Sequence, residues 1–126
     1  MEQQTSHTDK RSFPRAHARF LVSYGMVENT QFVITDVSQT RDIGMGGIRF
    51  TTSRPYEPDT AFGLHIRLPI TAQPVFVKGR VLACQEVTPD SIYETRVAFQ
   101  EIEERDRKNL CDTINYHVRK ETLKGY

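Results

Sequence analysis

Residues 62–68 read Phe-Gly-Leu-His-Ile-Arg-Leu and show the clearest period of two in the chain. Every second side chain is large and apolar, while His65 and Arg67 take alternate positions between them. Successive side chains of a β-strand point to opposite faces of its sheet, so this stretch is predicted to be a strand with one buried face. The residues predicted to form that face are Phe62, Leu64, Ile66 and Leu68.

Five more stretches have strand character, and polar, glycine-rich or proline-rich turns separate them. They are predicted strands at residues 19–26, 32–42, 48–51, 75–84 and 93–99. Gly79 interrupts the alternation of the fourth of these and predicts a bend or bulge. Strands joined by short turns predict an all-β fold, and closure into a six-stranded antiparallel β-barrel would remove exposed sheet edges.

The period changes after Phe99. Residues 101–120 contain no glycine or proline, and Leu110, Ile114 and Val118 recur with a spacing of four. That spacing predicts a C-terminal α-helix with one apolar stripe. Acidic residues early in the stretch and basic residues late in it complement the helix dipole.

Composition limits the class of protein. The chain has 126 residues and a net charge of +1, which suits one domain and disfavours a binder of long polyanions such as nucleic acid. No apolar run approaches the roughly 20 residues of a membrane span, and the polar N-terminus lacks the features of a secretory signal. The two cysteines, Cys84 and Cys111, fit no metal-ligand spacing and are predicted to be small buried side chains in a reduced, cytoplasmic setting. We expect a flexible segment at residues 1–9, a folded domain at 10–120 and a tail at 121–126.

Positive charge gathers just before the first predicted strand. Lys10, Arg11, Arg15 and Arg19 fall within ten residues that contain no acidic side chain. Two guanidinium groups on a short loop can bind phosphates and stack on purine rings. A solvated basic tail is the alternative interpretation of the same cluster.

Residues 41–50, Arg-Asp-Ile-Gly-Met-Gly-Gly-Ile-Arg-Phe, are a predicted strand–turn–strand with three glycines in four positions. Glycine lets a ligand approach the backbone, and the carboxylate of Asp42 can accept the paired N–H donors of a guanine edge. Residues 36–38, Asp-Val-Ser, begin in a similar way, but the position three after Ser38 is Arg41 and not glycine. They are therefore predicted to be ordinary strand residues.

Arg11-x-x-x-Arg15 followed by Asp42-x-Gly44-x-x-Gly47 resembles the PilZ domain family, whose pattern is RxxxR and then an acidic residue or Asn, any residue, Ser, two residues and Gly. The resemblance covers residues 9–120. It implies a non-enzymatic receptor for cyclic di-GMP that needs no other cofactor. It also implies that Arg11 and Arg15 bind phosphate and guanine, that Asp42 and Gly44 line a guanine, and that Gly47 holds the turn. Lys10 either adds a phosphate contact or stays solvated.

One departure from the family pattern is Gly44, which stands where the family has Ser. Loss of one neutral hydrogen bond, worth roughly 0.5–1.5 kcal/mol, is expected to weaken the site. We therefore expect Gly44→Ser to preserve the fold and to tighten binding. The alternative function is a PilZ-like protein-interaction module that has lost nucleotide binding.

Other functions are disfavoured by the residues. The chain shows no nucleophile elbow, Walker loop or paired carboxylates, and its phenylalanines fall mainly on apolar faces and not among surface cations. An enzyme and an oligonucleotide-binding barrel are therefore weak alternatives. The expected partners are cyclic di-GMP and an unidentified downstream protein that controls an output such as motility or biofilm formation, and the expected state is a monomer or a ligand-dependent dimer.

Overall fold

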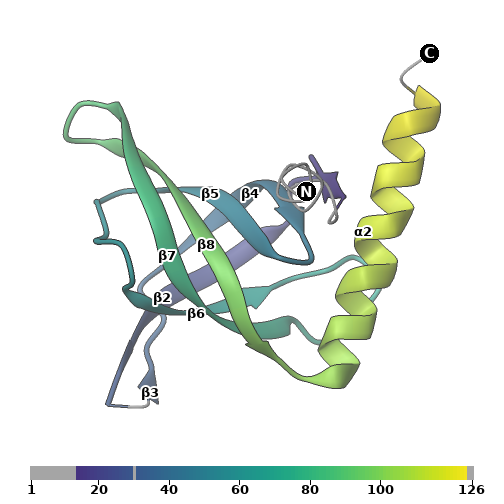
Figure 1. The fold of residues 1–126 in the computed structure, drawn as a ribbon, viewed down its shortest axis with the longest axis horizontal. Coiled ribbons are helices and arrows are strands. Elements are labelled where there is room, and N and C mark those ends of the chain that lie inside the picture. The colour runs from purple at the N-terminus through teal and green to yellow at the C-terminus, as the bar shows by residue number, and fades with distance from the viewer. Residues whose placement is uncertain (1–13, 30, 125–126) are drawn as a thin grey trace, which may run out of the picture.

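A computed structural model describes residues 14–29 and 31–124 as a six-stranded antiparallel β-barrel with one C-terminal helix (Figure 1). Neighbouring strands follow the order β4-β5-β8-β7-β6-β2, and pairing of β2 with β4 closes the barrel. The predicted fold class is confirmed. The six strands are β2 (Leu21–Glu28), β4 (Asp36–Gly44), β5 (Gly47–Thr52), β6 (Ala61–Ile66), β7 (Val75–Thr88) and β8 (Ile92–Ile102).

Two short strands at the margins of the barrel were not predicted. β1 (Arg15–Ala16) pairs with the end of β4, and β3 (Gln31–Phe32) pairs with the end of β2. A strand of two residues is too short to leave a period of two in the sequence. β1 carries Arg15, one of the predicted site arginines.

The prediction of one continuous strand over residues 32–42 is wrong. β3 ends at Phe32 and β4 begins at Asp36, and between them the chain passes close to Gly25. A side chain at Gly25 would lie 1.7 Å from the carbonyl oxygen of Val33, so only glycine permits this crossing. The N–H of Thr35 still donates to the carbonyl of Tyr24 at 2.8 Å, which keeps the irregular segment attached to β2.

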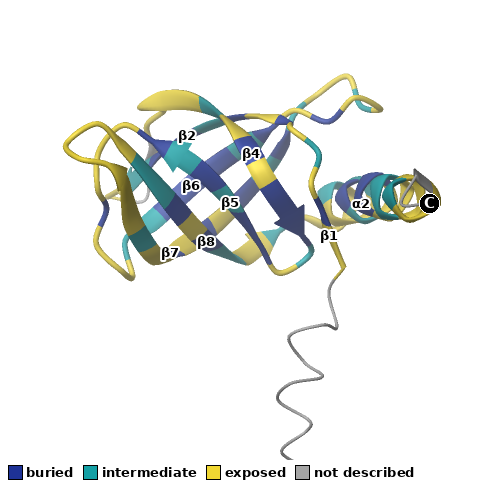
Figure 2. Cartoon of the chain, turned by 90° about the horizontal axis from the view of Figure 1, so that it is seen from above, coloured by how far each residue is buried: buried dark blue, intermediate teal, exposed yellow. Residues whose placement is uncertain are grey.

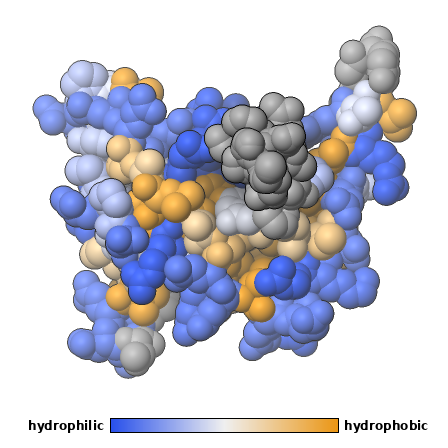
Figure 3. Space-filling view, in the orientation of Figure 1, coloured by the Kyte–Doolittle hydropathy of each residue, from blue (hydrophilic) through white to orange (hydrophobic). Residues whose placement is uncertain are grey.

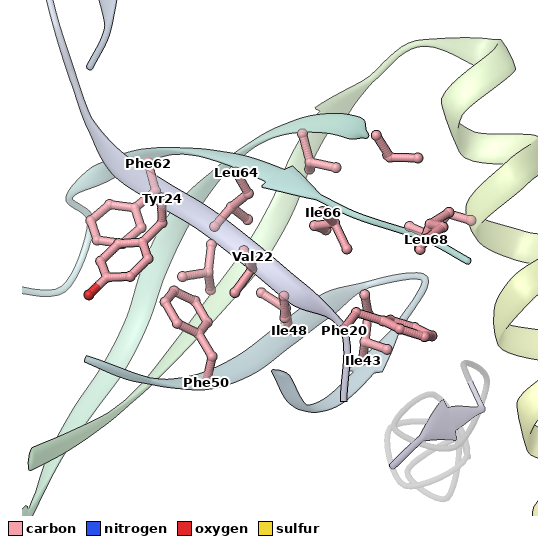
Figure 4. Close-up of a cluster of buried hydrophobic side chains, with 14 of the residues drawn as sticks. Phe20, Val22, Tyr24, Ile43, Ile48, Phe50, Phe62, Leu64, Ile66 and Leu68 are labelled. Atoms are coloured by element: carbon pink, nitrogen blue, oxygen red, sulfur yellow. The ribbon is translucent and has the colours of Figure 1, made fainter. Parts of the chain in front are cut away.

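The barrel interior is filled by the apolar faces of the strands (Figure 4). The four residues predicted to share one face in 62–68 are all buried, and the ring of Tyr24 stacks on that of Phe62 at 5.9 Å between centroids. Each large side chain buried in this way contributes roughly 1.5–3 kcal/mol relative to an exposed one. The face shown in Figure 3 is hydrophilic around its edges, and hydrophobic side chains gather toward the middle of the view.

The predicted bulge at Gly79 is confirmed by a shift of register between Lys78 and Gly79 in the pairing of β7 with β8. A second register shift lies between Val81 and Ala83, and Ala83 is exposed although the alternation in residues 75–83 predicts it on the same face as the buried Val81. Beyond it the β7–β8 hairpin projects from the barrel, on the side away from the helix (Figure 1).

Helix α2 (Glu104–Lys124) lies against the barrel through its predicted stripe, since Leu110 and Ile114 belong to the core (Figure 2). It begins three residues later than predicted because β8 continues to Ile102, and it extends to Lys124, into the predicted tail. No helix in residues 14–29 and 31–124 is long and apolar enough to cross a membrane. Cys84 and Cys111 are free thiols. Both are only partly buried, whereas buried side chains were predicted.

Candidate functional site

The candidate site lies on the outer surface of the barrel, where β4 ends and β5 begins. The pairing of these two strands shifts register between Thr40 and Asp42. A bulge of this kind re-aims a side chain, and here Asp42 is buried although Arg41 next to it is exposed. The site is therefore built around a carboxylate whose side chain is only 8% exposed.

Asp42 is held between two arginines from different strands. The Nε and an Nη atom of Arg15 both donate to Oδ1, at 2.8 and 2.5 Å. On the other side, Nε of Arg49 donates to Oδ2 at 2.7 Å, and a terminal nitrogen of the same guanidinium lies 2.6 Å from Oδ2. Charge-assisted bonds are the strong class of hydrogen bond, so both oxygens of Asp42 have strong partners.

The two arginines decide the ionisation of the carboxylate. Burial alone would raise the pKa of Asp42, but hydrogen bonds from Arg15 and Arg49 outweigh burial and lower that pKa below its ordinary value. The hydrogen bond to Asp42 raises the pKa of Arg49 in return. Asp42 is therefore an anion at neutral pH, able only to accept hydrogen bonds.

Gly44 has a structural role that the sequence did not indicate. Arg15 pairs with Gly44 as β1 lies along the end of β4. A Cβ atom at Gly44 would be 2.9 Å from the carbonyl oxygen of Pro14, closer than real Cβ atoms come to backbone atoms. The glycine therefore permits the close approach of β1 that brings Arg15 to Asp42.

Gly47 has an equally local reason to be glycine. A Cβ atom there would lie 2.5 Å from the carbonyl oxygen of Val97 on β8. The absence of a side chain at Gly47 therefore lets β5 lie close to β8 directly after the bend at residues 45–46.

The fold brings together four of the six predicted site residues, namely Arg15, Asp42, Gly44 and Gly47. The other two, Lys10 and Arg11, lie outside the described residues, as does the predicted flexible segment 1–9. Ser38 is a strand residue, as predicted, and its hydroxyl is 3.2 Å from that of Thr51.

Sequence reasoning missed Arg49 as a site residue. It follows Gly47 by two positions and points outward from β5, which a strict alternation of the strand would have indicated. Its Nη1 also donates to Glu94 at 3.2 Å. Arg96 on β8 is the direct cross-strand partner of Arg49, so its side chain lies on the same outer face.

The site thus offers one buried anionic acceptor among Arg15, Arg49 and Arg96. Such an arrangement suits a ligand that has both phosphates and N–H donors. The described residues contain no group of three or more His, Cys, Asp or Glu that could hold a metal ion.

Comparison with known proteins agrees with this architecture. The family model of the PilZ domain matches residues 9–115. Among curated proteins, no sequence matches the chain. Solved structures with the same fold include the Bacillus subtilis inhibitor of motility MotI/DgrA, with a TM-score of 0.70 and 18% identity over 90% of this chain.

Two other similar structures were solved with a ligand. The PilZ domain of YcgR from Escherichia coli with c-di-GMP has a TM-score of 0.61 and 13% identity, covering 92% of this chain and 97% of that one. The MrkH–c-di-GMP complex of K. pneumonia has a TM-score of 0.59 and 17% identity over 91% of this chain. The chain spans about half the length of MotI/DgrA and MrkH, at 52% and 53%. With the family model matched over most of its length, the chain belongs to the PilZ domain family, a family of receptor and adaptor modules.

Proposed function

We propose that the chain is a receptor for cyclic di-GMP that regulates a downstream protein. The observation that carries the proposal is the contact between Arg15 and Asp42, which are 27 residues apart in the sequence. These are residues to which the family pattern assigns ligand contacts, and they meet on an outer surface of the barrel beside Gly44. The similarity to structures solved with c-di-GMP supports the same ligand class.

Each part of the ligand has a matching group in the proposed site. The Asp42 carboxylate accepts the N1–H and N2–H donors of a guanine, which adenine lacks in that arrangement. The guanidinium of Arg15 binds phosphate or the guanine, together with Arg11 and Lys10 from the preceding segment. Arg49 and Arg96 add positive charge that attracts the phosphates.

Ligand binding requires an exchange of partners at Asp42. Arg15 occupies Oδ1 through two nitrogens, and Arg49 occupies Oδ2. The donors of a guanine need the same oxygens, so Arg15 leaves Oδ1 for the ligand while Arg49 continues to orient the carboxylate. The displacement of Arg15 moves β1 and changes the surface that a partner protein meets.

The proposed receptor is cytoplasmic and has no enzymatic activity of its own. Its signal passes through a protein partner, and the receptor is a monomer or forms a dimer with the ligand. Sedimentation of the full chain with and without cyclic di-GMP distinguishes these two states.

A protein-interaction module without nucleotide binding is the second candidate. It is supported by Gly44 in the family's Ser position and by the arginines that already occupy both oxygens of Asp42. In such a module, the Arg15–Asp42–Arg49 contacts would only fix β1 on the barrel.

Calorimetric titration of the full chain with cyclic di-GMP separates the two candidates. We expect one or two ligands bound per chain, weaker binding of cyclic di-AMP, and little binding of GMP. An absence of both heat and chemical-shift change at millimolar cyclic di-GMP would establish the interaction module instead.

A further inference from the structure

A groove with no assigned role runs between the loop at residues 67–71 and helix α2. Its first part encloses about 720 Å³ and is lined by Arg19, Phe20, Arg67, Leu68, Pro69 and His117, among others. A second hollow of about 440 Å³ shares Pro69 and His117 with the first and adds Ile70 and Tyr116. The two hollows adjoin at Pro69 and His117, and together they are called the groove.

The floor and walls of the groove are apolar and aromatic. Phe20 and Leu68 are core residues whose edges reach the groove. The ring of His117 meets those of Phe20 and Tyr116 edge to face, with centroids 5.3 and 5.2 Å away. Ile70 and Tyr116 remain 63% and 57% exposed, so a bound side chain would bury substantial apolar area.

Charge at the rim of the groove is positive. Arg19 and Arg67 are exposed, and within the described part of the chain neither guanidinium has a hydrogen bond or ion pair. Lys120 lies 5.7 Å from the ring centroid of Tyr116 and adds a third cation.

The acidic residues near the groove are already engaged. The carboxylate of Asp112, which lines the second hollow, lies 3.2 Å from Nζ of Lys108, and Glu121 accepts the N–H of His17 at 2.8 Å. Positive charge therefore lies beside both hollows, since Arg19 and Arg67 line the first and Lys120 lies over Tyr116 of the second.

From these features we infer that the groove is a docking site for an acidic peptide segment of a partner protein. In that segment, Asp or Glu residues flank an aliphatic or aromatic side chain. The carboxylates bind Arg19 and Arg67, and the apolar side chain packs between Ile70 and Tyr116.

A peptide fits the groove better than a nucleic acid does. Bases stack on exposed aromatic platforms among many cations, but here Phe20 is buried and aliphatic residues form much of the lining. The net charge of +1 also provides little of the long-range attraction that a polyanion requires.

The inference does not depend on cyclic di-GMP. Arg19 is close to Arg15 in the sequence, but it lines the groove, whereas Arg15 binds Asp42. Arg15 and Arg19 therefore belong to two different surfaces, although they are part of one basic cluster in the sequence. Each surface can be tested without the other.

A displayed library of random 12-residue peptides, selected against the immobilised full chain, tests the inference. We expect enrichment of peptides in which acidic residues flank Leu, Ile or Phe. A synthetic peptide from the selection should shift the amide resonances of residues 18–21, 67–71 and 112–120. The double variant Arg19→Ala/Arg67→Ala should bind that peptide at least tenfold more weakly, since each arginine contributes one charged contact.

The control is the double variant Arg41→Ala/Arg54→Ala, which removes the same charge from exposed arginines elsewhere on the barrel. It should bind the peptide as the native chain does. Equal weakening in both double variants would overturn the inference, because binding would then depend on net charge alone. Enrichment of peptides without acidic residues, an absence of enrichment, or tighter binding of a single-stranded oligonucleotide at the same residues would also overturn it. Self-association that is lost in Arg19→Ala/Arg67→Ala would identify a second copy of the chain as the occupant and would overturn it as well.

Discussion

Replacement of Gly44 tests whether the approach of β1 to β4 controls the candidate site. Gly44 has no positive φ, so the backbone itself tolerates a side chain. The cost comes from space, since a Cβ atom would lie 2.9 Å from the carbonyl oxygen of Pro14. Pro14 or β1 must therefore move by several tenths of an ångström.

We estimate the cost from what β1 contributes. Its pairing with β4 spans only two residues, and Arg15, whose side chain is 40% exposed, forms a salt bridge that solvent weakens. Loosening these contacts should cost about 1 kcal/mol of the free energy of unfolding. For a domain of this size, that corresponds to a fall in Tm of roughly 4 °C.

The weakening of the contacts between β1 and β4 should favour ligand binding. If cyclic di-GMP displaces Arg15 from Asp42, a variant in which β1 is already loosened needs less free energy for that displacement. Each 1 kcal/mol by which the contacts of β1 are weakened should tighten ligand binding about fivefold. Gly44→Ala supplies the Cβ contact alone, and Gly44→Ser adds a hydroxyl beside the proposed guanine. Serine should therefore lower Tm as alanine does and tighten binding further, by up to about tenfold for one hydrogen bond.

Thermal melts and calorimetric titrations of the native chain, Gly44→Ala and Gly44→Ser provide the measurements. An unchanged Tm for Gly44→Ala would refute the contact with Pro14. A lowered Tm together with weaker binding would refute the exchange of partners, because β1 would then be part of the binding-competent state.

Three further predictions concern the charged residues of the site. Arg15→Ala should weaken cyclic di-GMP binding about ten- to a hundredfold by calorimetry. Arg19→Ala, which changes the groove beside α2, should leave the affinity within about twofold of that of the native chain. Equal losses in the two variants would contradict the assignment of Arg15. Asp42→Ala should reduce the preference for cyclic di-GMP over cyclic di-AMP more than it reduces phosphate-driven binding, and an equal loss for both ligands would exclude Asp42 as the guanine acceptor. Because the folded-state pKa of Asp42 is lowered from its ordinary value near 3.8, its ion pairs stabilise the fold above that pH and lose this effect as the pH falls below it. Asp42→Asn and Arg49→Ala should therefore each reduce the fall of Tm with decreasing pH below about pH 4. If Tm of these variants falls with pH as it does in the native chain, the ion pairs of Asp42 contribute nothing to the stability of the fold.

The sequence predicted those parts of the fold that repeat along a strand or helix. Alternation in residues 62–68 and the spacing of Leu110 and Ile114 identified core faces, because burial of a face imposes a period on its residues. The break at residues 33–35 was missed because it depends on Gly25, which lies on another strand. Contacts between distant residues leave no local period.

The candidate site was predicted unevenly for a similar reason. Arg15 was found through a basic cluster and Asp42 through a glycine-rich turn, and the family motif then joined the two. Arg49 was missed because an arginine on an outward strand position is ordinarily a solvated residue. Its hydrogen bond to Asp42, with 2.7 Å between Nε of Arg49 and Oδ2 of Asp42, identifies it as part of the site.

The contact between Glu121 and His17 has a consequence for the choice of fragment boundaries. The family match ends at residue 115, but α2 continues to Lys124 and Glu121 accepts the N–H of His17 at 2.8 Å. A fragment trimmed to the family boundary would stop in the middle of the helix and leave that N–H without its acceptor. Affinities measured on such a fragment would describe a chain in which the segment next to Arg15 has lost its anchor.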